Sequence, residues 1–143
     1  MRIKKMNVHE EGLNRFLGPL EARVMDIIWT HKKIRIKEVH EILDGETSIS
    51  FNTVMTVMDR LHEKGYLMKT SGHDGKVKPY YYEPVQSKEE FIKEQTRAVT
   101  NGLIHEFGDL VVSHMIDAME DADPSLLDKL QNKIDQMKRR GRL

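Results

Sequence analysis

The sequence of 143 residues contains no cysteine. Disulfide bridges, thiol catalysis and thiolate metal sites are therefore excluded. Long hydrophobic runs are also missing, since no apolar segment approaches the roughly 20 residues that a membrane-spanning helix needs. The basic residues 1–5 are followed by no hydrophobic segment, so they are not expected to form a signal peptide. These absences predict a cytoplasmic protein with no membrane partner.

Net charge is the next quantity that the chain lacks. The 23 Lys and Arg residues balance the 23 Asp and Glu residues, whereas nucleic-acid-binding proteins usually carry a basic excess. The balance is uneven, because residues 1–86 hold 14 basic and 12 acidic residues, and residues 87–143 hold 9 and 11. Any interaction with DNA must therefore depend on where individual charges lie.

Motifs for catalysis and metal binding are missing as well. The sequence has no glycine-rich phosphate loop, no nucleophile motif and no paired-carboxylate motif, and its seven histidines show no ligand spacing. His105 and His114 lie near Glu106 and Asp109, but surface or interface histidines are the commoner outcome for such a group. The sequence indicates that the protein is not an enzyme and has no metal site and no cofactor.

What the chain does contain is a helical stretch, residues 49–67, with two different faces. Val54, Val57, Met58 and Leu61 recur at helical spacing and form one apolar side. Ser50 is placed to cap this helix, and Gly65 is placed to end it in a left-handed conformation. The other face carries Asn52, Met55, Thr56, Asp59 and Arg60, with Thr53 at its edge. Its Asn, Thr, Met and Arg side chains suit the base edges, thymine methyls and phosphates of a DNA groove. The alternative is an amphipathic helix whose polar face has no role.

Two helices are predicted before this stretch. The first begins at residues 17–21, with a proline near its first turn, and ends near His31, with Trp29 in its apolar sector. The second runs from about Ile36 to Leu43, and residues 44–48 form a turn by composition. Two short helices joined by a brief turn, the second with small hydrogen-bonding groups outward, are typical of a helix-turn-helix.

A basic hairpin is predicted next. Residues 66–70 and 77–83 read as strands around a turn at 71–75, with Tyr80 and Tyr82 on one face and Tyr81 on the other. The lysines of this hairpin are Lys69, Lys76 and Lys78. They suit a wing that contacts sugar-phosphate. A solvated hairpin whose lysines protect its edge is the alternative.

The C-terminal part is predicted to be helical. Residues 87–90 form a capping box that opens a helix to about Phe107, residues 108–109 break it, and residues 110–119 form a short helix that is apolar on most sides. Residues 123–124 start the last helix, which carries an apolar seam two heptads long. The residues predicted for a dimer interface are Phe91, Val99, Leu103, Leu110, Met115, Ile116, Leu127, Leu130, Ile134 and Met137.

These elements together predict a mainly α fold with two domains. Residues 1–86 are expected to form a winged helix-turn-helix DNA-binding domain with a small β-hairpin wing, in which residues 1–16 are a flexible arm. Residues 87–143 are expected to form a helical dimerisation domain, with the boundary marked by Pro84. The predicted function is sequence-specific DNA binding by a homodimer. The alternative is a winged-helix module for protein–protein interaction without operator binding.

One set of motifs resembles a known family. The run Thr53-Val54-Met55-Thr56-Val57-Met58-Asp59-Arg60-Leu61 with Lys64-Gly65, the segment from Leu20 to Trp29, and Tyr80-Tyr81-Tyr82 resemble the penicillinase-repressor (BlaI/MecI-type) family of winged-helix transcriptional regulators. The resemblance covers roughly residues 17–138, in the right order and spacing. It implies a homodimeric repressor that binds palindromic operators in double-stranded DNA through its N-terminal domain and dimerises through its C-terminal helices.

The resemblance also carries expectations about single residues. Thr53, Thr56 and Arg60 match family positions at the DNA, and Met55 stands where some members have arginine. Some members are inactivated by a protease that cuts an Asn-Phe bond, and Ser113-His114 stands at that place here. The copper-responsive relatives carry a C-terminal cysteine cluster, which this chain lacks. Copper sensing through thiolates is therefore excluded, while the inducing signal stays open.

Overall fold

A computed structural model describes residues 6–7, 9–71 and 79–141 of the chain. The chain forms two compact units, Met1–Ala98 and Val99–Leu143. The units therefore divide further along the chain than the predicted boundary after residue 86. The reason is that the residues just after this predicted boundary include Phe91 and Gln95, whose side chains are buried, so this segment completes the core of the first unit.

The first unit opens with a 3-10 helix, η1 (Gly12–Arg15), within the segment predicted to be a flexible arm. The side-chain amide of Asn7 donates a hydrogen bond of 2.8 Å to the backbone oxygen of Asn14. Leu13 and Phe16 pack against the hydrophobic core. The described part of this segment is thus folded onto the unit, and only residues 1–5 and 8 lie outside the description.

Helix α1 (Pro19–His31) begins as predicted, with Pro19 at its first position and a hydrogen bond of 3.1 Å from the backbone N–H of Gly18 to Glu21 Oε1. Its buried residues are Ala22, Val24, Met25, Ile27 and Ile28. Trp29 lies at the edge of the core, where its ring packs 5.5 Å from that of Phe91 and its Nε1 donates to the backbone oxygen of Gln86. Trp29 thus packs against the core from the apolar sector of α1, where the sequence places it.

Helix α2 (Ile36–Glu46) extends beyond the predicted end at Leu43, through residues predicted to form a turn. Glu46, in its last turn, forms an ion pair with Arg23 of α1. The Asp44 carboxylate accepts a hydrogen bond of 3.2 Å from the backbone N–H of Ile49. These contacts stabilise a helical turn whose composition, taken alone, favours a loop.

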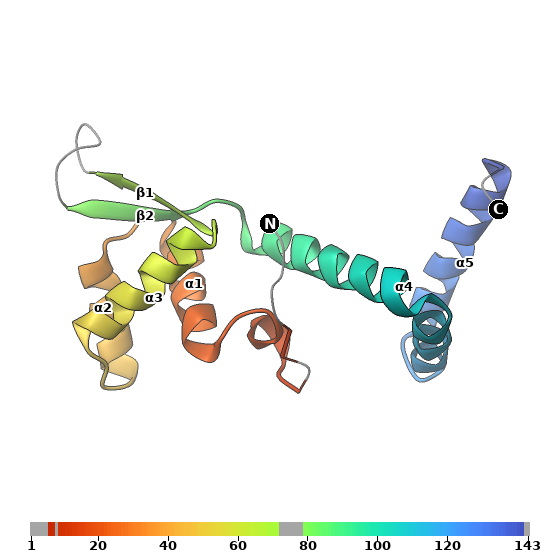
Figure 1. Cartoon of the computed structure of the whole chain (residues 1–143), viewed down its shortest axis with the longest axis horizontal. Helices are drawn as coiled ribbons and strands as arrows, with labels where there is room; N and C mark the ends of the chain where they lie inside the picture. Colours follow the sequence, from red (N-terminus) through yellow and green to blue (C-terminus); the bar gives the residue numbers. More distant parts are fainter. Residues whose placement is uncertain (1–5, 8, 72–78, 142–143) are drawn as a thin grey trace. The chain divides into compact units, whose positions relative to one another are not determined.

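Helix α3 (Phe51–Glu63) has the two faces that its sequence predicts. Ser50 Oγ accepts a hydrogen bond of 3.1 Å from the backbone N–H of Thr53, which caps the helix. Gly65, just beyond its end, has a φ of 84°, which a residue with a Cβ atom rarely adopts. The buried residues are Val54, Val57, Met58 and Leu61. In Figure 1, α3 packs beside α1 and α2, and these three helices share one hydrophobic core.

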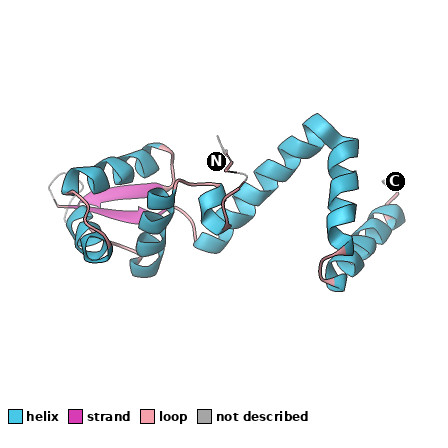
Figure 2. Cartoon of the chain, turned by 90° about the horizontal axis from the view of Figure 1, so that it is seen from below, coloured by secondary structure: helices cyan, strands magenta, loops and turns pink. Residues whose placement is uncertain are grey.

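A two-stranded hairpin follows α3. Strands β1 (Leu67–Ser71) and β2 (Tyr80–Pro84) pair antiparallel, with Lys69 opposite Tyr82, and appear in magenta in Figure 2. Ile34, between α1 and α2, is joined to Tyr82 by backbone hydrogen bonds of 3.1 and 2.8 Å. This bridge fixes the hairpin against the helices. Residues 72–78, which include Lys76 and Lys78, lie outside the described residues.

Helix α4 (Lys88–Glu120) begins at the predicted cap, where Ser87 Oγ accepts a hydrogen bond of 3.1 Å from the backbone N–H of Glu90. Phe107 is non-helical, with φ −130° and ψ 26°, and kinks the helix. The predicted break at residues 108–109 is therefore a kink one residue earlier. Phe91, which the sequence places in a dimer interface, is instead 1% exposed and packs its ring 5.1 Å from that of Tyr66.

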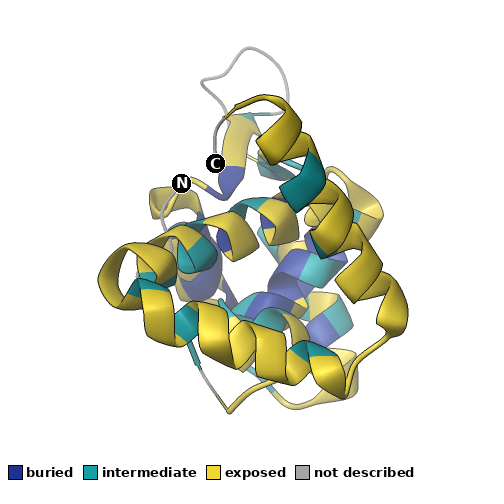
Figure 3. Cartoon of the chain, turned by 90° about the vertical axis from the view of Figure 1, so that its right-hand side faces the viewer, coloured by how far each residue is buried: buried dark blue, intermediate teal, exposed yellow. Residues whose placement is uncertain are grey.

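The second unit consists of the remainder of α4 and helix α5 (Pro124–Arg139), which Asp123 caps through a hydrogen bond of 2.9 Å from Ser125 N–H. None of the described residues from 99 to 141 is buried, and the residues coloured dark blue in Figure 3 belong to the first unit. Of the predicted interface residues, Val99, Leu103, Leu130 and Ile134 are half-buried, and Leu110, Met115, Ile116, Leu127 and Met137 are exposed. None of the helices in the described ranges combines the length and apolarity needed to cross a bilayer.

Candidate nucleic-acid interface

The outer face of α3 is exposed. It carries all of the residues that the sequence places at DNA on this helix, namely Asn52, Thr53, Met55, Thr56 and Arg60. Arg60 takes part in none of the ion pairs between described residues. The guanidinium group of Arg60 and several short polar side chains are therefore exposed together on one surface of the molecule.

The hydroxyl groups of the two threonines on this face both form hydrogen bonds within the chain. Thr56 Oγ1 donates a hydrogen bond of 2.9 Å to the backbone oxygen of Asn52, and Thr53 Oγ1 lies 2.8 Å from Ser50 Oγ. Each hydroxyl keeps lone pairs that can accept a further hydrogen bond. Each residue also retains a methyl group, so both can contact a base edge through polar or apolar atoms.

Asp59 is on α3, and its carboxylate contacts the hairpin. Its Oδ1 atom accepts a hydrogen bond of 3.4 Å from the hydroxyl of Tyr82. Burial, followed by the charge of Asp59 and this hydrogen bond, raises the pKa of Tyr82 to about 12. The tyrosine therefore stays protonated and available as a donor at neutral pH, and the carboxylate is held toward the hairpin.

Lys69 is the described lysine of the predicted wing, and its side chain lies over aromatic rings. Its Nζ atom is 4.5 Å from the ring centroid of Tyr80 and 5.8 Å from that of Tyr82. Lys33 lies 5.2 Å from the ring centroid of Tyr81. Tyr80 and Tyr82 thus share one face of the strand and Tyr81 takes the other, as the alternation of strand side chains predicts.

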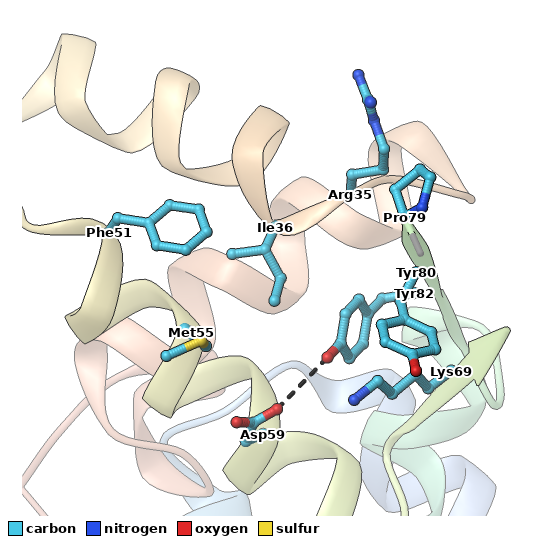
Figure 4. A pocket seen from close by; sticks show the side chains of 9 residues that line it. All are labelled: Arg35, Ile36, Phe51, Met55, Asp59, Lys69, Pro79, Tyr80 and Tyr82. Carbon is cyan, nitrogen blue, oxygen red and sulfur yellow. Dashed lines mark hydrogen bonds between the residues drawn. The ribbon is translucent and has the colours of Figure 1, made fainter. Parts of the chain in front are cut away.

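A hollow of about 280 Å³ opens beside these residues, between α3, the start of α2 and the hairpin. Its lining consists of Arg35, Ile36, Phe51, Met55, Asp59, Lys69, Pro79, Tyr80 and Tyr82, which Figure 4 shows together. The sequence predicts DNA contacts for Met55 and Lys69 but does not single out Phe51, which lines the same hollow. The signal was available, because Phe51 and Met55 are four residues apart and so lie on one helix face.

The position of α3 is fixed at its C-terminal end by an ion pair. Lys64 Nζ lies 2.8 Å from Glu21 Oε2 of α1. Burial opposes ionisation of Glu21, yet the hydrogen bonds from Lys64 and from the backbone of Gly18 hold the pKa of this carboxyl below its usual value. The exposed face of α3 is thus oriented by contacts on its opposite side.

Together, α2 and α3 form a helix-turn-helix, and the paired strands β1 and β2 follow as its wing. The fold is therefore a winged helix-turn-helix with a C-terminal helical region. The family model described as "Penicillinase repressor" matches residues 17–136, and the chain belongs to this family.

The chain is also similar to individual proteins. The chain is 31% identical over 77 residues to "Transcriptional regulator BlaI" of Mycobacterium tuberculosis, in strains CDC 1551 / Oshkosh and ATCC 25618 / H37Rv. This match covers 53% of the chain and 53% of each relative, or about half the length of both. The "Solution structure of the DNA binding domain of the repressor BlaI" is 27% identical, with a TM-score of 0.43, and the match covers 57% of this chain and 93% of that one.

Proposed function

We propose that this protein is a transcriptional repressor that binds a palindromic DNA operator as a homodimer. The carrying observation is the exposed outer face of α3, where Thr56 and Arg60 stand on the second helix of a helix-turn-helix. The N-terminal residues of such a helix contact base edges in the major groove. Membership of the penicillinase repressor family supports the same function.

Each group on this surface has a separate role in the proposal. Asn52, Thr53 and Thr56 present hydrogen-bonding groups and methyl groups to base edges. Arg60 contacts a phosphate or a guanine, and Lys69 contacts the phosphate backbone from the wing. Lys76 and Lys78, outside the described residues, are proposed to extend that backbone contact. These local charges compensate for the absence of a net positive charge.

The second unit supplies the proposed dimer interface. Its large apolar side chains Leu110, Ile116 and Leu127 are 59%, 46% and 40% exposed. Exposed apolar surface of this kind typically marks a protein interface. A second copy of the chain would bury it, and the two-fold symmetry of the dimer would match a palindromic operator. Phe91 has no part in this proposal because it is buried in its own chain.

The dimer can be tested in the full chain by sedimentation at micromolar concentration. Leu127→Asp should convert the dimer to a monomer, because a carboxylate would then face the apolar surface of the second copy. Asn132→Asp is the matched control, since it adds the same charge on the other side of α5 and should leave a dimer. A wild-type chain that sediments as a monomer would contradict the proposed interface.

A second candidate function is a winged-helix module that binds another protein. The zero net charge and the apolar hollow beside α3 are the observations that favour it. In this case the surface formed by α3 and the hairpin would dock a protein, and no DNA sequence would be preferred.

A selection experiment separates the two functions. The full chain is incubated with a library of random DNA duplexes, bound duplexes are amplified through several rounds, and the affinity of the selected duplex is measured across salt concentrations. A repressor should enrich one palindromic sequence, with an affinity that falls steeply as salt rises. Failure to enrich any sequence, with weak binding to all duplexes, would favour the protein-binding module.

A further inference from the structure

The outer face of α3 carries two large apolar side chains among its polar ones. Phe51 is 43% exposed and Met55 is 36% exposed. They lie one helical turn apart and line the same hollow, together with Ile36, as Figure 4 shows. Two such residues on one face of the proposed DNA-reading helix form a continuous apolar surface rather than isolated exposed groups.

The Phe51 ring is held in its outward position by the neighbouring helix. His40 of α2 packs edge-on against it, with ring centroids 5.8 Å apart and an interplanar angle of 80°. The ring of His40 is itself fixed, because its Nε2 atom lies 2.8 Å from the backbone oxygen of Ile49. The phenyl ring is therefore packed in part against α2, and the remainder of Phe51 is exposed.

Cationic groups stand around this apolar surface. Arg35 and Lys69 both line the hollow, Arg35 in an ion pair of 3.0 Å with Glu38, and Arg60 is exposed further along α3. The carboxylate of Asp59 is engaged by the Tyr82 hydroxyl. An apolar centre with a positively charged border is complementary to the major groove of DNA, where base methyl groups lie between two rows of phosphates.

We infer that Phe51 and Met55 set the base preference of this protein by contacting the 5-methyl groups of thymines in the major groove. This inference rests on the proposed DNA-binding function and names the bases that its recognition helix selects. Thymine is the base that presents a methyl group there, whereas an apolar side chain leaves the donors and acceptors of the other bases unpaired. Phe51 is the first residue of α3, where base contacts concentrate, and the flexible side chain of Met55 adapts to the shape of its contact.

The test uses the duplex that the full chain selects from a random library. Each thymine in turn is replaced by deoxyuridine, which removes the methyl group and leaves base pairing unchanged. Replacement at one or two positions in each half-site should weaken binding about fourfold per methyl group. At those positions, Met55→Ala or Phe51→Ala should bind the thymine and deoxyuridine duplexes equally.

Met68→Ala is the matched control. Met68 is 47% exposed and adjacent to Lys69 on β1, so its side chain lies on the opposite face of the hairpin from the hollow. This variant should keep the full difference between thymine and deoxyuridine. Met55 and Met68 are exposed and make no ring contact, so their variants should melt at the wild-type temperature, which circular dichroism checks. Phe51→Ala loses the ring contact with His40 and should melt slightly lower while remaining folded.

The possible outcomes distinguish failure of the thymine-contact inference from failure of the proposed DNA-binding function. If no duplex is enriched, the proposed function fails and the inference fails with it. If a duplex is enriched but no deoxyuridine replacement weakens binding, the inference is overturned and the proposed repressor function still stands. If replacement weakens binding equally in the wild type and in the Met55→Ala and Phe51→Ala variants, another residue contacts the methyl groups and the assignment is overturned.

Discussion

The hydroxyl of Tyr82 donates a hydrogen bond to the carboxylate of Asp59 at 3.4 Å, and this bond joins the second strand of the wing to helix α3. Tyr82 is fully buried, and its backbone is also bonded to Ile34. One residue of the wing therefore contacts both the proposed DNA-reading helix and the segment that connects α1 to α2. The orientation of the wing relative to α3 depends on this position.

The first prediction concerns the charge of Asp59. Asp59→Asn should lower the pKa of Tyr82, which would stay above its ordinary value because burial is the largest cause of the shift. The same substitution should tighten binding to random duplexes, since it removes a negative charge near the proposed DNA surface. Tyrosine ionisation is followed by ultraviolet absorbance and binding by electrophoretic mobility. Glu63→Gln, which removes a charge elsewhere on α3, should leave the pKa of Tyr82 unchanged.

The second prediction concerns the hydroxyl and methyl groups of Thr56. Thr56→Ala should weaken binding to the selected duplex by about 1–3 kcal/mol while the melting temperature holds. Thr30→Ala is the matched control, because Thr30 is also exposed on a helix and donates a similar hydrogen bond, of 2.8 Å, to the backbone oxygen of Asp26. Should Thr56→Ala instead melt early and bind normally, the outer face of α3 would be structural.

The third prediction concerns phosphate contact by the wing. Lys69→Ala should weaken binding to all duplexes alike and reduce the slope of log affinity against log salt by about 1. Lys33→Ala is the control, since Lys33 also lies over a tyrosine ring, but on the other face of the strand. Equal salt slopes for the wild type and Lys69→Ala would contradict the phosphate contact and indicate that Lys69 only packs on the tyrosine rings.

The fourth prediction concerns the extent of the first unit. Phe91 packs against Trp29 and Tyr66, so Phe91→Ala should lower the free energy of unfolding by about 3–5 kcal/mol. A fragment ending at Ala98 should unfold cooperatively in urea, and one ending at Gln86 should not. The chain has a single tryptophan, whose fluorescence reports on this contact. Equal stability of the two fragments would contradict the place of Phe91 in the core.

The fifth prediction concerns pH. Burial opposes ionisation of Glu21, but its hydrogen bonds from Lys64 and Gly18 lower the pKa below 4.5. A carboxyl with a depressed pKa in the folded state stabilises the fold above its unfolded pKa, and that stability is lost as pH falls through the folded value. The difference in unfolding free energy between wild type and Glu21→Gln should therefore be largest at neutral pH and should shrink as the pH falls through the lowered pKa of Glu21. A difference independent of pH would show that the ionised form makes no contribution.

The amino-acid sequence by itself determined the recognition-type helix and its ends. Ser50 caps α3 and Gly65 follows it in a left-handed conformation, as predicted, because both effects act within a few residues along the chain. The apolar spacing of Val54, Val57 and Leu61 likewise gave the buried face, since 3.6 residues per turn fixes which side chains share a side. The alternation that separates Tyr81 from Tyr80 and Tyr82 is equally local.

The tertiary structure alone decided where Phe91 lies and how far the first unit extends. The periodicity of α4 shows that Phe91 is on an apolar side, but periodicity does not say which surface covers that side, and here it is Trp29 and Tyr66 of the same chain. The last turn of α2 and the Asp59–Tyr82 hydrogen bond have the same origin. Each depends on residues far apart in sequence, whose approach is set by packing of the whole unit rather than by local preference.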